Sequence, residues 1–121
     1  MSEIDKIKKR KDFLRVAKGI KVVTQSLILQ AAQSLSMEET PPKIGYTTSK
    51  KIGKAHVRNR TRRRLRAAVQ EIFPDKALKN IEYVLIGRYN TATCDFSILK
   101  DNLSFALKRA NKEISKNETK E

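Results

Sequence analysis

The sequence predicts an α+β fold, a single two-layer sandwich in which about four strands form one sheet and three helices pack against it. Apolar residues recur at steps of three and four over residues 57–73 and 95–114, which predicts two long helices. Short runs rich in β-branched and aliphatic residues predict strands over residues 20–32, 43–49 and 81–88. The order of helix, strands, helix, strand and helix suits one sheet with helices mostly on one face. The 121 residues fit a single domain spanning residues 1–121.

The first half of the chain is predicted to begin with a short helix. Residues 5–18 partly follow helical spacing, and Gly19 is a stop signal. Residues 20–32 are predicted to form one strand, or two strand segments that meet near Thr24. The polar and acidic segment at residues 34–42 ends in two prolines and is predicted to be a surface loop. In the strand that follows, Gly45 indicates a bulge or a close approach to the backbone.

The second half contains the two strongest helical patterns. The first ends at Pro74, and its apolar face consists of Val57, Thr61, Leu65, Ala68, Val69 and Ile72. The apolar run at residues 81–88 is typical of a central strand. The second helix, residues 95–114, has a buried stripe that consists of Phe96, Leu99, Leu103, Ala106, Leu107, Ala110 and Ile114. The remaining residues, 115–121, are predicted to be a charged, flexible tail.

The charge of the chain indicates a polyanionic partner. Lysine and arginine number 27 against 13 acidic residues, and the formal net charge is +14. Such a surplus repels itself, whereas contact with phosphates releases condensed counterions. A membrane is less favoured, because no apolar run approaches the roughly 18 residues that span a bilayer and tryptophan is absent. The single cysteine and the lack of an apolar signal region predict a cytoplasmic protein.

The segment from Lys50 to Arg66 concentrates this charge. It contains nine basic residues and no acidic one; the basic residues are Lys50, Lys51, Lys54, Arg58, Arg60, Arg62, Arg63, Arg64 and Arg66. Solvated helices normally interleave glutamate with lysine or arginine, because like charges four residues apart destabilise a helix. Arginine also binds phosphate bidentately and stacks on bases. We therefore predict that the segment binds RNA, with Asn59, Arg60 and Arg63 opposite the buried face.

Residues 44–66 resemble the signature of the bacterial ribonuclease P protein subunit family. That signature is a strand, a Ser-Lys-Lys-(Ile/Val)-Gly turn and a helix that opens on Arg-Asn-Arg. This chain has Ser49-Lys50-Lys51-Ile52-Gly53 followed by Arg58-Asn59-Arg60. Weaker similarity covers most of the chain, including the family's first helix around Phe13, its central strand at residues 83–88 and its last helix.

The resemblance implies a fold and a division of labour. The family's βαβ unit has a left-handed crossover, whereas the general rule favours a right-handed one. A catalytic RNA subunit, with Mg²⁺, removes the 5′ leader of precursor tRNA, and the protein supplies no catalytic residue. The positions that the resemblance assigns to binding of the RNA subunit are Lys50, Lys51, Lys54, Arg58, Asn59, Arg60, Arg62, Arg63 and Arg66. The positions assigned to the leader, in a cleft between the sheet and the first helix, are Phe13, Gln30, Tyr46 and Ser49.

Two positions depart from some members of the family. Ala17 stands where others carry a second aromatic residue, and Gln30 stands where some carry tyrosine. Neither side chain therefore offers a ring for stacking on a leader base.

Two other functions are open on the residues alone. A ribosomal or RNA-chaperone binding protein would explain the charge and the basic helix, but not the specific turn that precedes Arg58. A DNA-binding helix-turn-helix protein is disfavoured, because predicted strands flank the basic helix. His56 is the only histidine and Cys94 the only cysteine, whereas a zinc site needs three or four ligands. No motif resembles a two-metal nuclease or a phosphate-binding glycine loop. We therefore expect no metal site in the protein and no cleavage of RNA by the protein alone.

Overall fold

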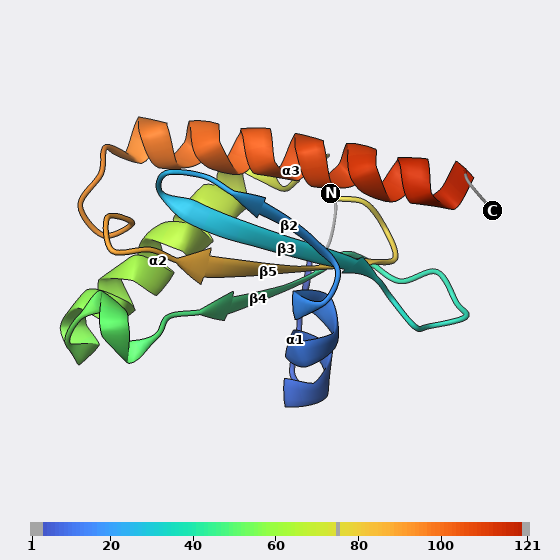
Figure 1. Ribbon diagram of the computed structural model, residues 1–121, viewed down its shortest axis with the longest axis horizontal. Helices are drawn as coiled ribbons and strands as arrows, with labels where there is room; N and C mark the ends of the chain where they lie inside the picture. The colour runs from blue at the N-terminus through green and yellow to red at the C-terminus, as the bar shows by residue number, and fades with distance from the viewer. Residues whose placement is uncertain (1–3, 75, 120–121) are drawn as a thin grey trace.

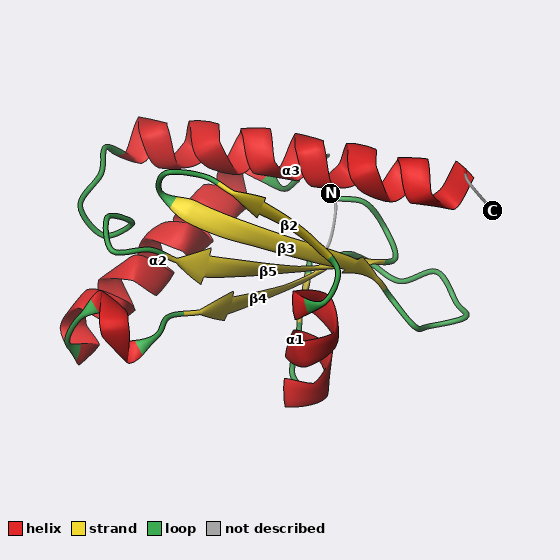
Figure 2. Ribbon diagram, viewed as in Figure 1, coloured by secondary structure: helices red, strands yellow, loops and turns green. Residues whose placement is uncertain are grey.

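The computed structural model describes residues 4–74 and 76–119, which form one mixed sheet covered by helices (Figure 1, Figure 2). The strands are β1 (Asp5–Lys6), β2 (Ile20–Val23), β3 (Leu27–Gln33), β4 (Lys43–Thr47) and β5 (Ile81–Gly87). The helices are α1 (Arg10–Ala17), α2 (Ala55–Ile72) and α3 (Phe96–Thr119), with a 3₁₀ turn, η1 (Lys50–Ile52), ahead of α2. The sheet order is β1-β4-β5-β3-β2. The predicted α+β class is confirmed, with five strands in the described part of the chain instead of about four.

Strand β5 is the central strand that its apolar run predicts. It pairs in parallel with β4 and antiparallel with β3, and β2 continues the sheet beyond β3. The predicted segment at residues 20–32 is therefore two strands joined by a tight turn. In this turn the Thr24 hydroxyl donates to the Leu27 carbonyl oxygen (2.7 Å) and accepts from the Leu27 N–H (3.1 Å).

The fifth strand corrects the prediction for the N-terminal segment. Residues 5–6 lie at the edge of the sheet, parallel to β4, and not in the first helix. The Asp5 N–H donates to the Pro42 carbonyl oxygen (2.9 Å), and the Ile7 N–H donates to that of Ile44 (3.0 Å). These partners lie far along the chain, so local spacing did not reveal them. Helix α1 consequently begins at Arg10 instead of residue 5.

The connection from β4 through α2 to β5 has the left-handed crossover that the family resemblance implies. The two strands are parallel neighbours, so the connection is a βαβ unit. In Figure 1 both arrows point left, β5 lies above β4 and α2 lies behind the sheet. A right-handed connection would place the helix in front, as it does in nearly all such units.

The two faces of the sheet are covered unequally. Alternate residues of β3 and β5, such as Leu29 and Leu85, face α2 and α3 and form the main core. On the other face, Val84 packs with Ile7 and Val16 in a smaller core under α1. Because α1 has only eight residues, it covers only part of this face. The family resemblance places the leader-binding cleft on this face of the sheet, beside α1.

The two long helices match their predicted faces more closely than their predicted ends. Thr61, Leu65, Ala68 and Val69 are the buried residues of α2. Helix α3 continues to Thr119, past the predicted end at residue 114, so residues 115–119 are helical. Residues 120–121 of the predicted tail lie outside the described residues. None of the helices described here has the length and apolar character needed to cross a bilayer.

Candidate RNA-binding surfaces

The segment between β4 and α2 brings the basic residues of η1 and α2 together. Ser49 precedes η1 in an extended conformation, and Gly53 follows it with φ of +148°. Side chains are strained in that conformation, and an added Cβ at Gly53 would lie 3.3 Å from the Cβ of Val57. This turn leaves Lys50 and Lys51 exposed directly ahead of the first turn of α2.

The outer face of α2 consists of the residues that helical geometry predicts. Asn59, Arg60 and Arg63 are exposed, opposite the fully buried Leu65. Arg63 has no hydrogen bond or ion pair within the described residues, so its guanidinium is available to an external partner. Lys54 at the N-terminal end is also exposed and makes no side-chain cap, so the positive end of the helix dipole adds to the charge there.

No carboxylate neutralises this surface in the part of the chain that the structure describes. The ion pairs found there all lie elsewhere, and none involves a basic residue between Lys50 and Arg66. Arg62 lies four residues from Arg58 and from Arg66, and each such like-charge pair costs an isolated helix roughly 0.2–0.5 kcal/mol. A bound polyanion would offset this repulsion.

Two arginines of α2 hold the loop between β5 and α3. Arg60 donates from Nε to the Ala92 carbonyl oxygen (2.8 Å), and Arg64 donates from Nη2 to the Cys94 carbonyl oxygen. The Arg64 guanidinium also lies 5.9 Å from the centre of the Phe96 ring, within cation–π distance. Cys94 is partly buried and packs against the main core. Arg64 therefore stabilises the fold, a role that the charge pattern did not reveal.

The flank of α2 beside β4 is positioned by contacts of its own. Arg62 donates to the Thr48 hydroxyl (3.1 Å) and to the Asn59 side-chain oxygen (2.6 Å). The Arg66 guanidinium lies 5.6 Å from the centre of the Tyr46 ring. Because these contacts hold two guanidinium groups in place, a partner that bound them would cost less side-chain entropy.

One aromatic ring and one ion pair fix α1 to the sheet. The Phe13 ring lies so close to Gly45 that an added Cβ there would be 2.5 Å from the ring Cε1. Gly45 is therefore a close approach, one of its two predicted explanations. Arg15 Nη2 lies 2.6 Å from Glu82 Oε1, and its Nη1 donates to the Gln33 carbonyl oxygen (2.7 Å). Glu82 is 4% exposed, so its carboxylate depends on this partner.

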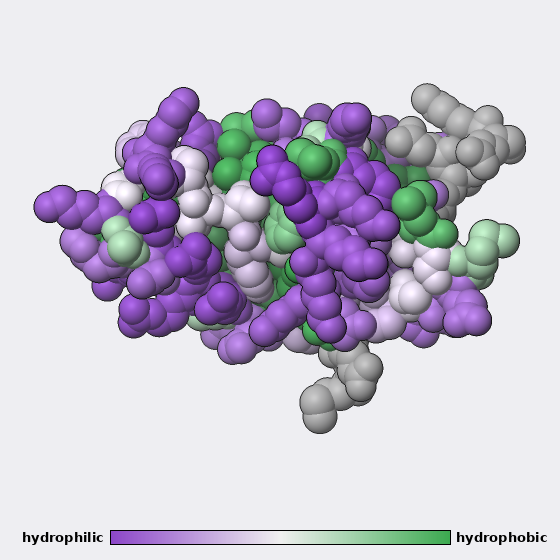
Figure 3. All heavy atoms as spheres, turned by 90° about the horizontal axis from the view of Figure 1, so that it is seen from below, coloured by the Kyte–Doolittle hydropathy of each residue, from purple (hydrophilic) through white to green (hydrophobic). Residues whose placement is uncertain are grey.

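A row of side chains on the α1 side of the sheet is not covered by a helix. We call this row the open strip; it consists of Val23, Ile28, Ile86 and Thr47, which are neighbours in register across β2, β3, β5 and β4. Val23 is 54% exposed and the others are half-buried. In Figure 3 pale and green residues lie between a hydrophilic area on the left, on the side of α2, and another near the centre, where α1 lies. Phe13 and Ile86 pack against the same small core, so the aromatic ring borders the strip.

The four predicted leader-binding residues are not all brought together. Phe13 and Gln30 lie on the α1 side, where Gln30 pairs with Val84 and is 9% exposed. Ser49 is exposed beyond the end of β4, next to η1. Tyr46 lies on the opposite face, packed against the main core. A single strand of RNA along the open strip could contact Phe13, Gln30 and Ser49 more readily than the ring of Tyr46.

Tyr46 is instead coupled to α2. Its burial raises the pKa of its hydroxyl to about 12, and the nearby Arg66 partly opposes this rise. The hydroxyl therefore stays protonated at neutral pH and offers no negative charge to Arg66. The contact between them is between a cation and a neutral aromatic ring.

The described residues offer no obvious ligand set for a metal ion. No group of three or more histidine, cysteine, aspartate or glutamate side chains is close enough together to hold one in residues 4–74 and 76–119. His56 is exposed at the start of α2, away from such partners. The expected Mg²⁺ therefore remains a prediction for a complex with RNA.

The comparison with known proteins agrees with the signature in residues 44–66. The chain matches the family model named Ribonuclease P over residues 1–111. It belongs to the ribonuclease P protein family. The ribonuclease P protein component of Paramagnetospirillum magneticum is 44% identical over 111 residues, which cover 89% of this chain and 84% of that protein. That of Gluconacetobacter diazotrophicus is 44% identical over 107 residues, covering 87% and 90%.

The fold is also that of a solved member of this family. The RNase P protein from Thermotoga maritima superimposes with a TM-score of 0.72 at 22% identity, over 87% of this chain and 96% of that one. The resemblance stated from the sequence is thus confirmed at the level of family and fold. The basic surface of η1 and α2 belongs to a protein of a tRNA-processing enzyme family.

Proposed function

We propose that the chain is the protein subunit of a ribonucleoprotein ribonuclease P that removes the 5′ leader from precursor tRNA. The exposed basic residues of η1 and α2 bind the catalytic RNA subunit. The open strip, with Phe13 at its border, binds the leader. The observation that carries the proposal is the basic surface between Lys50 and Arg66, which no carboxylate in the described residues neutralises, in a chain of this family.

The open strip has the properties that a single-stranded leader requires. Proteins bind single strands by stacking bases on aromatic and apolar side chains beside a positively charged groove. Phe13 and the aliphatic side chains of the strip provide the first part. Arg62, held against Thr48 at the end of β4, provides charge beside the strip. The surfaces for the RNA subunit and for the leader therefore adjoin.

We assign hydrolysis of the phosphodiester to the RNA subunit and to Mg²⁺ bound with it, as the family resemblance implies. The protein lowers the free energy of the complex by neutralising phosphates and by positioning the leader. It contributes no general acid or base in this proposal.

Reconstitution tests the proposal directly. Purified chain should not remove the leader from precursor tRNA, whereas the chain mixed with the RNA subunit should restore cleavage at a low Mg²⁺ concentration at which the RNA alone is slow. Cleavage by rigorously RNA-free protein would contradict the division of labour. Co-purification with ribosomal subunits, without any effect on processing, would favour the ribosomal or RNA-chaperone alternative.

The leader site has a matched pair of variants on α1. Phe13→Ala should weaken binding of precursor tRNA by roughly 5- to 150-fold, the equivalent of about 1–3 kcal/mol for one stacked base, and spare mature tRNA. Leu14→Ala is the control, because Leu14 is the next residue of the helix and its side chain is 53% exposed. Equal losses with both tRNAs would show that Phe13 does not act on the leader.

A further inference from the structure

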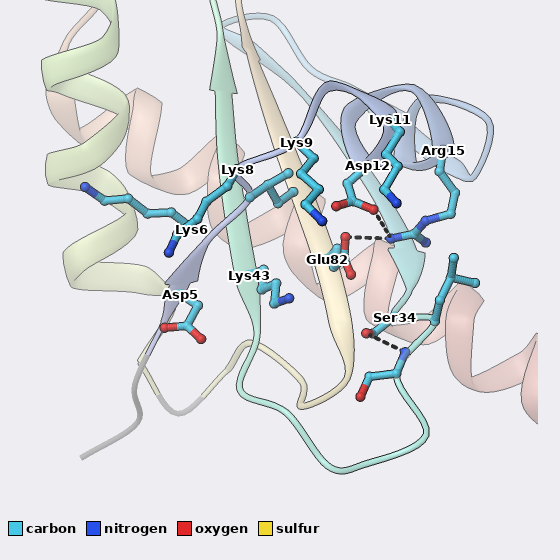
Figure 4. Close-up of a pocket in the computed structure, with 13 residues that line it drawn as sticks. Asp5, Lys6, Lys8, Lys9, Lys11, Asp12, Arg15, Ser34, Lys43 and Glu82 are labelled. Carbon is cyan, nitrogen blue, oxygen red and sulfur yellow. Dashed lines mark hydrogen bonds and ion pairs between the residues drawn. The ribbon is translucent and has the colours of Figure 1, made fainter.

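A second feature on the α1 side of the sheet is a cavity of about 630 Å³ (Figure 4). Its lining includes Lys43 and Glu82, at the beginnings of β4 and β5, whereas the open strip lies at the ends of these strands. Residues before and within α1 form one wall, and Ser34 and Ser36 of the loop after β3 form another. Helix α1 therefore separates the cavity from the open strip.

The lining of the cavity has a surplus of positive charge. Its basic members are Lys6, Lys8, Lys9, Lys11, Lys43 and Arg15, and its acidic members are Asp5, Asp12 and Glu82. Arg15 forms ion pairs with two of the acidic residues, because its Nη2 lies 2.6 Å from Glu82 Oε1 and 3.7 Å from Asp12 Oδ1. The five lysines form no ion pair with any residue that the structure describes. Figure 4 shows Lys9 and Lys11 extending into the cavity toward the Arg15–Glu82 pair.

This lining selects for a hydrated anion. Cavities for small organic ligands span a similar range of volumes, roughly 300–1,000 Å³, but their walls are mainly apolar. Here lysines surround the Arg15–Glu82 ion pair, whose two charges neutralise each other. Lysine binds phosphate as a mobile point charge. Phosphates along a flexible strand fit such a wall better than one rigid, buried ligand does.

We propose that this cavity binds backbone phosphates of the distal 5′ leader, in nucleotides upstream of those at the open strip. The inference rests on the proposed function and extends it to a longer stretch of substrate. The cavity and the open strip lie on the same side of the sheet, whereas α2 packs against the other side. A leader that passes Phe13 and the N-terminal end of α1, with its run from Lys8 to Lys11, reaches the cavity. The RNA subunit, held by α2, does not need to reach it.

The decisive variant is Lys9→Gln combined with Lys43→Gln. The holoenzyme would be reconstituted with the RNA subunit, and the dissociation constant measured for precursor tRNAs whose leaders are lengthened one nucleotide at a time. For the unmodified protein we expect affinity to rise again once the leader extends past α1. The variant should lose this later increase, by roughly 5- to 25-fold for one or two lost phosphate contacts at about 0.1 M salt, and the salt slope for long leaders should fall by about 0.7 per contact.

The control is Lys108→Gln combined with Lys112→Gln, which removes the same charge from exposed positions of α3. This control should retain the increase with leader length. Lys9→Gln with Lys11→Gln, two exposed positions, repeats the test if the first variant unfolds. Equal weakening at all leader lengths, weaker binding of the RNA subunit, or the same effect in the control would overturn the proposal. These outcomes differ from failure of the proposed function, in which the unmodified protein would not stimulate processing at all.

Discussion

Replacing Arg63 or its neighbour Arg64 with alanine should separate RNA binding from folding. The two residues are adjacent in sequence and carry the same charge. Arg63 is exposed and has no partner in the described residues, whereas Arg64 binds the Cys94 carbonyl oxygen and lies over the Phe96 ring. Their variants should therefore fail in different assays.

The expected magnitudes follow from these contacts. Arg63→Ala removes one phosphate contact, which lowers affinity for the RNA subunit by roughly 5- to 8-fold at about 0.1 M salt and reduces the salt slope by about 0.7–0.9. Its stability should stay within about 0.5 kcal/mol, because no intramolecular contact is lost. Arg64→Ala loses a charge-assisted hydrogen bond and a cation–π contact at a half-exposed site, and should cost about 2 kcal/mol of unfolding free energy.

Two measurements distinguish the role of Arg63 from that of Arg64. Urea unfolding of the free protein gives the change in stability, and titration of the RNA subunit over a range of salt concentrations gives the affinity and its slope. The reasoning would be refuted if Arg64→Ala left the urea midpoint unchanged and lowered the salt slope as Arg63→Ala does. Both arginines would then face the RNA, and the loop contacts would have no energetic importance.

Three further predictions test how the sheet is held. Gly45→Ala should force the Phe13 ring away and destabilise the protein by about 1–3 kcal/mol, and Phe13→Ala should then cost less in thermal unfolding when it is added to Gly45→Ala than when it is made alone. Arg15→Met should cost about 3–5 kcal/mol in urea unfolding at neutral pH, because the buried Glu82 carboxylate loses its partner, while Glu82→Gln should be milder. Burial raises the pKa of Tyr83 to about 12, above its usual value near 10. The unfolded state therefore loses the hydroxyl proton at a lower pH than the folded state, and the free energy of unfolding should fall as pH rises from about 10 to about 12. Tyr83→Phe should reduce that fall in unfolding experiments.

Features with a strong local signal were predicted well from the sequence. The face of α2 follows from the spacing of Thr61, Leu65 and Val69, since a helical period of 3.6 places them on one side. The outward position of Arg63 follows from the same geometry. The central strand follows from an apolar run buried on both faces, because only the middle of a sheet buries both.

Features that depend on distant partners were not predictable. The pairing of β1 depends on carbonyl groups of Pro42 and Ile44, and the ion pair that fixes α1 joins Arg15 to Glu82 across 67 positions. Glu82 is a single acidic residue within an apolar run, which is the one local indication in the sequence that it forms a buried ion pair. The hand of the crossover has no local signal at all, and there the family resemblance outweighed a general rule.

The position of Tyr46 changes how leader binding should be understood. Alternation along β4 places Gly45 under Phe13 on one face and Tyr46 against α2 on the other. An extended strand on the α1 side therefore cannot stack on both rings. If Tyr46 affects leader binding, it acts through Arg66, whose guanidinium it contacts, and Tyr46→Phe should then change little because the ring remains. Among the predicted leader residues, only Phe13 therefore presents an aromatic ring on the α1 side of the sheet.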